Sequence, residues 1–306
     1  MEFRKLGKSD LSVSLIGLGC NNFSGRIDLD IARSVIEKSL DLGINFFDTA
    51  DVYGGKGGSE EYLGKILGSK RKKIILATKF AMPMDDSGFL SGASRKYIHK
   101  AIEASLKRLK TDWIDLYQVH RPDITIDPDE TMLALNELVQ QGKVRYIGCS
   151  NYSPKQLVDA QSVFINDDSK KFISCQDEYS LLVRDIEKEL TNTFQSYGMG
   201  LLPYFPLASG LLTGKYKENE SLPDNSRFSA WPQLSNRYMT EHNWKKIHNL
   251  EKFCKRNNIK LLELAFIWLA SKPFVSSIIA GATSPKQVSE NVDTLKCKIT
   301  KSQLKE

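Results

Sequence analysis

Eight short apolar runs, each bounded by turn residues, alternate with helical patterns along this chain of 306 residues. The runs lie at residues 14–20, 44–48, 74–80, 114–120, 144–150, 172–176, 200–205 and 276–282. Continuous apolar strands that alternate with helices are typical of a parallel sheet with helices on its faces. At this length, the economical closure of such a sheet is one (β/α)8 barrel, a TIM barrel, occupying residues 1–306 as a single domain.

Residues that start and stop helices flank the segments between these runs. Ser94 stands at the start of one periodic segment, Pro128 lies in the first turn of another, and Gly43 ends a third. Helices are expected at 30–43, 94–110, 127–143, 153–161 and 284–295, and two more within 241–271, separated near 257–258.

A doubly wound sheet is the alternative architecture, but its nucleotide-binding fingerprint is incomplete. The stretch GLG at 17–19 is followed by CNN, so the third glycine of the dinucleotide motif is missing. The glycine run at 54–60 lacks the Lys-Ser/Thr pair of a phosphate loop. Both glycine clusters are therefore predicted to be turns.

The composition limits the kinds of protein this can be. Hydrophobic residues make up 41% and charged residues 26%, which is ordinary for a soluble globular protein. No apolar run reaches the roughly 18 residues of a membrane span, and the N-terminus lacks the apolar core of a secretory signal. Five scattered cysteines without a CxxC pair argue for reduced thiols rather than disulfides or zinc. We therefore expect a cytoplasmic protein without a membrane association.

The net charge of +6 is a mild excess of basic residues. Its densest run, KRKK at 70–73, directly precedes an apolar strand and is predicted to be a solvated loop rather than a nucleic-acid surface. A phosphate-bearing small molecule needs only isolated Lys or Arg residues. No nucleic-acid partner is expected, and the sequence does not indicate an oligomeric state.

Polar side chains stand where six of the eight expected strands end. In a barrel of this kind, the active site forms at the C-terminal ends of the strands. One polar strand end is usually a cap, whereas six on one rim indicate a site. These residues, in strand order from the second to the seventh, are Asp48, Lys79, His120, Ser150 with Asn151, Gln176 and Tyr204.

Asp48, Lys79 and His120 can form a proton-donating pocket together with Tyr53, which lies on the loop after Asp48. A phenol has a pKa of about 10 and keeps its proton at neutral pH. Lys79 is expected to lower that pKa, and Asp48 to hold the Lys79 ammonium in place. His120 offers an N–H to a carbonyl oxygen. Such general acid catalysis is typically worth about 10²–10⁴ in rate.

Four motifs give the chain a close resemblance to the aldo-keto reductase family. DTADVYG contains the Asp and the Tyr, ATKF the Lys, and LYQVHRPD the His, while GKVRYIGCSNYS resembles the fifth-strand signature. The resemblance runs from FRKLGKSDLSVSLIGLG to IIAGATSPKQVSENV, nearly the whole chain. It implies that the segments EFRKL and LSVS form a β-hairpin that closes the barrel bottom.

The resemblance also implies an activity, the NADPH-dependent reduction of an aldehyde or ketone. Hydride passes from the nicotinamide to the carbonyl carbon while Tyr53 protonates the oxygen. By the family pattern, Ser150, Asn151 and Gln176 hydrogen-bond the carboxamide and Tyr204 stacks on the nicotinamide. The expected cofactor partners elsewhere are Gly19, Cys20, Asn21 and Asp48, and around the pyrophosphate Phe205, Pro206, Leu207, Ala208, Ser209 and Gly210.

The adenosine end of the expected cofactor site departs from the family pattern. Many relatives have a Ser where Phe205 stands, an Arg where Gln287 stands, and a Lys where Gly281 stands. Lys215 and Arg227 are the candidates for the 2′-phosphate, with Lys286 as a third, so NADPH is expected over NADH. The adenosine contacts are expected at Gly281, Thr283, Gln287, Glu290 and Asn291.

The substrate is expected to be a small-molecule carbonyl compound. The loop above the third strand and the connection between Leu207 and Tyr238, long enough to act as a lid, are expected to shape its pocket. The candidate pocket residues are Asn22, Phe23, Phe80, Met82, Phe89 and Trp231.

Two other functions remain open on sequence grounds. One is an NADPH-binding sensor or auxiliary subunit, similar to the potassium-channel β subunits that share the fold and cofactor site. The other is a metal-dependent barrel hydrolase with Asp48 and His120 as ligands. The first strand lacks the His-x-His of such barrels, and the other histidines fall in expected helices. We therefore expect no metal.

Overall fold

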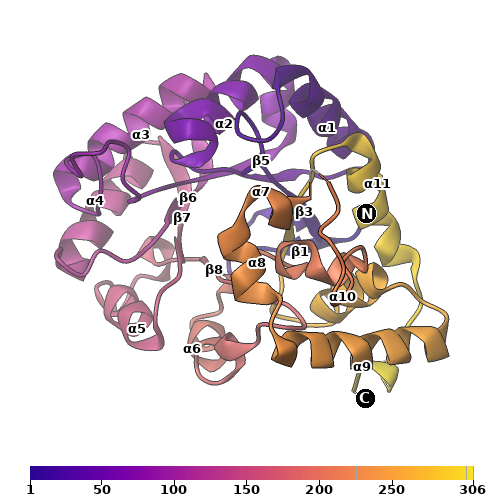
Figure 1. The fold of residues 1–306 in the computed structure, drawn as a ribbon. Helices are drawn as coiled ribbons and strands as arrows, with labels where there is room; N and C mark the ends of the chain where they lie inside the picture. The colour runs from indigo at the N-terminus through magenta and orange to yellow at the C-terminus, as the bar shows by residue number, and fades with distance from the viewer. Residues whose placement is uncertain (225, 301, 306) are drawn as a thin grey trace.

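All eight expected strands form one parallel sheet in the computed structural model, which describes residues 1–224, 226–300 and 302–305 (Figure 1). The strand order around the sheet is β10-β3-β4-β5-β6-β7-β8-β9. Its members are β3 (Ile16–Gly19), β4 (Phe46–Asp48), β5 (Ile75–Phe80), β6 (Ile114–Val119), β7 (Val144–Ser150), β8 (Ser174–Gln176), β9 (Gly200–Leu201) and β10 (Ile278–Gly281).

Backbone hydrogen bonds join the two ends of this sheet. The Ser276 N–H donates to the Leu201 carbonyl at 2.9 Å, and the Ile279 N–H donates to the Pro203 carbonyl at 3.0 Å. Leu201 ends β9, and Ile279 lies in β10. The two strands at the ends of the stated order, β9 and β10, therefore lie side by side and close the sheet. The predicted (β/α)8 barrel is confirmed.

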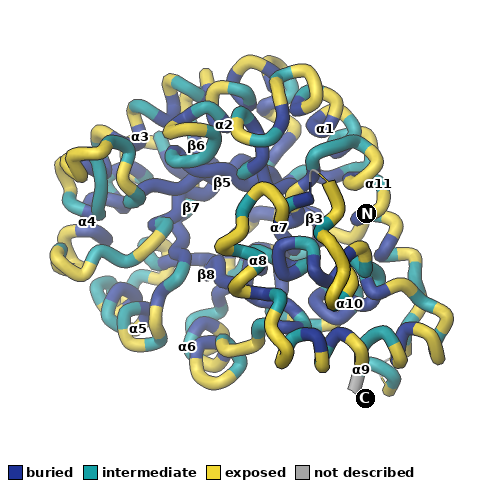
Figure 2. The backbone as a smooth tube through the Cα atoms, in the orientation of Figure 1, coloured by how far each residue is buried: buried dark blue, intermediate teal, exposed yellow. Residues whose placement is uncertain are grey.

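The helices form the outer layer of the barrel, with buried inner faces and exposed outer ones (Figure 2). The helices that the sequence predicts begin and end close to their predicted bounds. The helices are α1 (Leu29–Asp41), α2 (Tyr53–Ile66), α3 (Arg95–Leu109), α4 (Pro128–Gln140), α5 (Pro154–Ser162), α6 (Leu190–Ser196), α7 (Arg227–Ala230), α8 (Pro232–Tyr238), α9 (Glu241–Asn257), α10 (Leu261–Ala270) and α11 (Pro285–Asp293).

Helix caps explain these bounds. The Ser94 side chain accepts from the Tyr97 N–H at the start of α3, and Ser153 forms a capping box with Gln156 at the start of α5. Asn258 adopts a left-handed φ of 51° and separates α9 from α10. These local signals are readable in the sequence, so these helices could be predicted, whereas α2, α6, α7 and α8 were not expected.

The expected N-terminal hairpin is present as β1 (Phe3–Lys5) and β2 (Ser12–Ser14), paired antiparallel. Its apolar side chains Leu6, Leu11 and Val13 cluster with barrel residues such as Phe46 and Leu116. Because these residues are buried, the hairpin seals the N-terminal end of the barrel. The opposite end is left as the place for a ligand.

The two glycine clusters behave differently from each other. The cluster at 54–57 is a turn as expected, with four successive positive φ values from Gly54 to Gly57. The cluster at 17–19 is not a turn but part of β3, so that prediction was wrong. A Cβ on Gly17 would lie 2.7 Å from the Ser277 Oγ, so glycine here allows β3 and β10 to pack closely.

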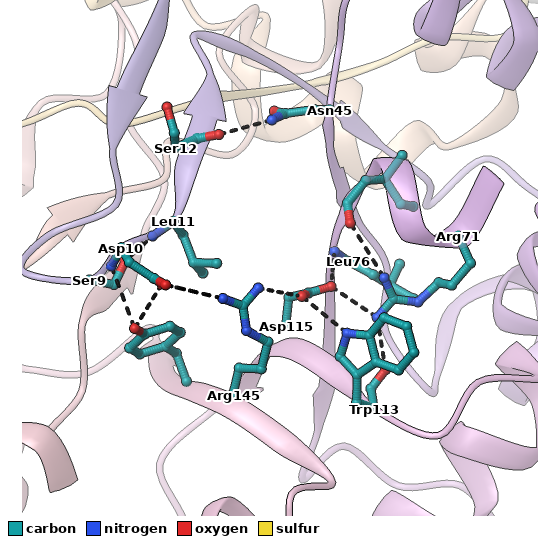
Figure 3. A network of polar contacts seen from close by, with 12 residues as sticks. Ser9, Asp10, Leu11, Ser12, Asn45, Arg71, Leu76, Trp113, Asp115 and Arg145 are labelled. Atoms are coloured by element: carbon teal, nitrogen blue, oxygen red, sulfur yellow. Dashed lines mark hydrogen bonds and ion pairs between the residues drawn. The ribbon is translucent and has the colours of Figure 1, made fainter. Parts of the chain in front are cut away.

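A buried polar network crosses the N-terminal end of the barrel (Figure 3). Asp115 in β6 accepts from Arg71 at 2.9 Å and from Arg145 at 3.0 Å. The Leu76 N–H and the Trp113 Nε1 also donate to this carboxylate. Arg71 departs from the prediction that KRKK is a solvated loop, because its guanidinium is buried over the Trp113 ring, whereas Lys72 and Lys73 are exposed as expected.

Removing the central charge of this network is expected to destabilise the fold. Asp115→Asn leaves the buried Arg71 guanidinium without its charged partner. Breaking a buried ion pair costs about 3–5 kcal/mol of the free energy of unfolding. Urea unfolding measures this loss. Asp159→Asn is the matched control, because its ion pair with Lys155 is exposed and should contribute less than about 1 kcal/mol. Equal losses in both variants would contradict a buried role for Asp115.

Candidate active site

A cavity of about 860 Å³ opens at the C-terminal end of the barrel, within the size range of small-molecule sites. Most predicted site residues line it, drawn from the ends of seven strands. Lys79 lies beneath the cavity wall, and Ala208 is buried behind its neighbours. The predicted residues in the wall are Gly19, Cys20, Asn21, Asp48, Tyr53, His120, Ser150, Asn151, Gln176, Tyr204, Phe205, Pro206, Leu207, Ser209, Gly210, Lys215, Arg227, Gly281, Thr283, Gln287, Glu290 and Asn291.

The predicted Asp, Lys and Tyr meet at the ends of β4 and β5. The Lys79 Nζ lies 2.6 Å from the Asp48 Oδ2 and donates to the Thr49 carbonyl at 2.8 Å. The same Nζ lies 3.5 Å from the Tyr53 hydroxyl. Both members of the Asp48–Lys79 pair are buried. A fixed ammonium therefore lies beside the phenol that faces the cavity.

The segment between β4 and α2 positions Tyr53, the first residue of α2, over the rim of the cavity. The four residues after Tyr53 adopt positive φ, and three of them are glycines. A Cβ on Gly54 would lie 2.5 Å from the Phe23 carbonyl oxygen. Glycine therefore allows the chain to turn tightly behind Tyr53, which explains the glycine run that follows it.

The direction of the Tyr53 pKa shift corrects the sequence-based prediction. Burial disfavours the tyrosinate and raises the Tyr53 pKa above 10.0, although Lys79 acts in the lowering direction. Desolvation thus outweighs the ammonium. For Lys79, burial acts to lower the pKa, but the Asp48 carboxylate and the Tyr53 hydroxyl together outweigh burial and the pKa is raised. The phenol and the ammonium therefore both keep their protons at neutral pH.

His120 follows β6 and faces Tyr53, with the ring centroids 5.6 Å apart in an edge-on arrangement. Burial, and then the charges of Lys79 and Arg121, hold the His120 pKa well below 6.5. The imidazole is therefore neutral at pH 7 and retains one N–H. Its Nδ1 has no hydrogen-bond partner among the described residues. The ring is available to a ligand in the cavity.

The predicted carboxamide-binding residues form a chain of hydrogen bonds across β7, β8 and β9. The Ser150 hydroxyl donates to the Gln176 carbonyl at 2.7 Å, and the Tyr204 hydroxyl donates to the Asn151 Oδ1 at 2.8 Å. The Gln176 Nε2 donates to the Asp48 Oδ1 at 2.9 Å. The network therefore connects this side of the cavity to the Asp48–Lys79 pair.

Gln118 is a buried partner that the sequence reasoning missed. Its Nε2 donates to the Asp48 Oδ1 at 3.2 Å. The signal was its polar side chain inside an apolar strand, two residues before His120. A polar residue in the middle of a buried strand requires an internal partner.

Only two of the six candidate substrate-pocket residues line the cavity, namely Asn22 and Met82. Phe80 is fully buried and stacks on Tyr117, and Phe23 is fully buried in the main core. Phe89 is 87% exposed on its loop and lies outside the cavity wall. Large aromatic side chains near strand ends contributed to packing here more often than to a pocket. These three placements correct the sequence-based expectation.

Trp231 borders the cavity through two arginines that do line it. The guanidinium of Arg227 lies 5.1 Å from the Trp231 ring centroid and that of Arg26 lies 5.4 Å from it. Arg227 also lies over Phe205 at 5.0 Å, and its Nε is buried without a hydrogen-bond partner. Burial, and then Arg26, lower the Arg227 pKa. Such an arrangement favours an anion.

The long connection after β9 is partly helical rather than an open loop. It contains α7, α8 and a short 3₁₀ segment, η4 (Ala208–Thr213). Leu212, Tyr216, Phe228 and Tyr238 bury one another in a second core beside the barrel. This packing places Lys215 and Arg227 at the cavity. Lys286 instead is exposed and lies 3.8 Å from Glu290.

Three further arginines line the cavity and were not predicted. Arg26 follows β3, Arg121 follows His120, and Arg237 ends α8 and forms an ion pair with Glu178. The sequence offers no periodic signal for them because all three lie outside the strands. Within the described ranges, no cluster of His, Cys, Asp or Glu could hold a metal, and no helix has the length and apolar character to cross a membrane.

The sequence profile of the aldo/keto reductase family matches residues 15–306, which is nearly the whole chain. The barrel, its sealing hairpin and the cavity at the strand ends agree with that match. The chain therefore belongs to the aldo/keto reductase family.

Several relatives cover most of both chains. A probable voltage-gated potassium channel subunit beta of Oryza sativa subsp. japonica is 36% identical, over 96% of this chain and 91% of that protein. The L-glyceraldehyde 3-phosphate reductase of Escherichia coli (strain K12) is 33% identical, over 96% and 88%. An uncharacterized oxidoreductase of Bacillus subtilis (strain 168) is 34% identical, over 100% and 94%. The family match and the two relatives named as a reductase and an oxidoreductase support the conclusion that this chain is an oxidoreductase.

Proposed function

We propose that this protein reduces small aldehydes or ketones to alcohols with NADPH as the hydride donor, and that Tyr53 is the proton donor. The observation that carries this proposal is the buried Asp48–Lys79 pair, whose ammonium lies 3.5 Å from the Tyr53 hydroxyl in the cavity wall. A neutral His120 on the neighbouring strand supplies a second donor to the same oxygen.

The residues present fit a nicotinamide dinucleotide. Within the part of the chain that the structure describes, the buried Arg227 Nε and Ser209 hydroxyl have no hydrogen-bond partner, and both residues line the cavity where a phosphate group would need donors. At the far end, Thr283 and Gln287 line the cavity beside α11. The cavity is continuous from these residues to Tyr53. A long anionic ligand is the kind of molecule that such a cavity suits.

In the proposed mechanism, the carbonyl oxygen lies between Tyr53 and His120. Bound NADPH would supply a hydride to the carbonyl carbon. As negative charge grows on the oxygen, Tyr53 donates its proton and the Lys79 ammonium stabilises the resulting tyrosinate. Asp48 holds the ammonium in place, and Gln118 and Gln176 hold Asp48. Solvent then returns a proton to Tyr53.

The direct test follows NADPH absorbance with a panel of small aldehydes and ketones. Oxidation of NADPH that requires the carbonyl compound and yields the alcohol in equal amount is the expected result. NADPH binding without turnover of any compound would overturn the reductase proposal. Failure to bind NADPH at all would also overturn the cofactor assignment.

The cofactor preference gives a separate prediction. Arg227→Ala is expected to raise the Kd for NADPH by about tenfold or more relative to that for NADH, because a charge-assisted hydrogen bond is worth about 1.5–3 kcal/mol. Fluorescence titration of both cofactors measures the ratio. Lys96→Ala is the control, since Lys96 is exposed on α3 and lies outside the cavity wall. An unchanged ratio in Arg227→Ala would exclude this arginine as the 2′-phosphate contact.

A second candidate is an NADPH-binding sensor or auxiliary subunit, and the relative named as a potassium channel subunit beta favours it. The complete Asp48, Lys79, Tyr53 and His120 set favours turnover instead. Stable association with a partner, together with NADPH binding and no carbonyl reduction, would support the sensor. We keep a cytoplasmic location as a prediction, consistent with five free cysteines.

A further inference from the structure

Arg121 is a cation on the side of the cavity away from the expected adenosine end. In the closed order β10-β3-β4-β5-β6-β7-β8-β9, β6 is the fourth strand after β10 and so lies opposite it. Gly281 to Asn291 follow β10, whereas Arg121 follows β6 directly after His120. Arg121 therefore adjoins the carbonyl position rather than the cofactor's phosphates.

No internal partner uses the Arg121 charge. Among the residues that the structure describes, no carboxylate forms an ion pair with it, and its side chain is exposed at the cavity. Asp123, two residues further along the chain, directs its side chain to the Ala93 N–H at 2.9 Å and the Thr125 hydroxyl at 2.6 Å. The Arg121 guanidinium is thus free to meet a ligand.

The charges around the carbonyl position are unbalanced. Asp48 is paired with Lys79, and the cation Arg237 is paired with Glu178. Arg121 has no such carboxylate partner among the residues that the structure describes. The remaining acidic residues of the wall lie on or beside α10 and α11, at the other end: Glu263, Glu290 and Asp293. The end of the cavity that contains Tyr53 and His120 therefore has a positive potential, which attracts anions.

We infer that the carbonyl substrate of this protein bears an anionic group, a carboxylate or a phosphate, which Arg121 binds while the carbonyl oxygen lies on Tyr53 and His120. This inference rests on the proposed reductase function and names its substrate class. An arginine presents a planar fork of donors that matches both kinds of anion. The anionic group thus orients the carbonyl toward the proton donor.

Two matched pairs of aldehydes test the inference. Butanal is compared with 4-oxobutanoate, and glyceraldehyde with glyceraldehyde 3-phosphate, so that each pair differs mainly in charge. We expect the wild type to show a kcat/KM at least about tenfold higher for the anionic member of a pair, the scale of one charge-assisted hydrogen bond. The pair with the larger ratio distinguishes a carboxylate from a phosphate. The preference should also weaken as salt is raised.

Arg121→Gln is expected to reduce that ratio by about tenfold, mainly through KM, while Arg121→Lys keeps part of it. Lys100→Gln, which removes an exposed charge on α3, should leave the ratio unchanged. A wild-type ratio near one, or an unaltered ratio in Arg121→Gln, would overturn the inference and leave the reductase standing. If neither charged nor neutral carbonyls are reduced, the proposed function itself fails and the inference falls with it.

Discussion

Tyr53→Phe is expected to lower kcat for carbonyl reduction by about 10²–10⁴-fold, the usual contribution of a positioned general acid. The substitution removes one hydroxyl that faces the cavity 3.5 Å from the Lys79 Nζ, and it leaves the ring packing beside His120 intact. Among the residues that the structure describes, Lys79 has no other hydroxyl within hydrogen-bonding distance. Steady-state oxidation of NADPH with a reactive aldehyde measures the loss.

Tyr62→Phe is the matched control, because Tyr62 lies on the same helix, α2, outside the cavity wall. The pH profile gives a second test. Since the Tyr53 pKa is raised above 10.0, the acid form persists through neutral pH. Reduction by the wild type should therefore stay level through neutral pH and decline only in strongly alkaline solution. A Tyr53→Phe variant with full activity would assign proton donation to another group.

Lys79→Met is expected to reduce both stability and activity. It leaves the Asp48 carboxylate buried with only Gln118 and Gln176 as side-chain donors. Removing one partner of a buried ion pair costs about 3–5 kcal/mol of the free energy of unfolding. The loss of the ammonium also withdraws stabilisation from the tyrosinate. Urea unfolding and steady-state kinetics measure the two effects separately.

A double variant separates the two effects of Lys79. Asp48→Asn combined with Lys79→Met removes both charges, so stability should recover in part while activity stays low. Lys65→Met is the control for loss of a lysine, because the pair of Lys65 with Glu61 is exposed and its loss should cost less than about 1 kcal/mol. Recovery of activity in the double variant would show that the ammonium is not needed for catalysis.

The barrel and much of its rim could be predicted from local signals. A buried strand is mostly apolar, so Asp48 and His120 at the ends of apolar runs mark where the strands end. Parallel strands bring such ends to the same side of the sheet. Caps such as Ser94 and Ser153 similarly mark where helices begin. These features depend on neighbours in the sequence.

The parts that were mispredicted depend on neighbours in space. Phe80 is buried because Tyr117 of the adjacent strand stacks on it, and Arg71 is buried because Asp115 and Trp113 receive it. The sign of the Tyr53 pKa shift required the balance between burial and the Lys79 charge. Neither burial nor cross-strand partners can be read from one sequence.

The Asp115 network and the rim occupy opposite ends of the same strands. Asp115 lies near the start of β6, and His120 follows the end of the same strand. Substitutions that share no partners generally add independently. Residues of the cavity wall such as Met82 and Arg121 can therefore be exchanged without weakening the ion pairs at the other end of the barrel. Substrate preference can change in this way while the scaffold is retained.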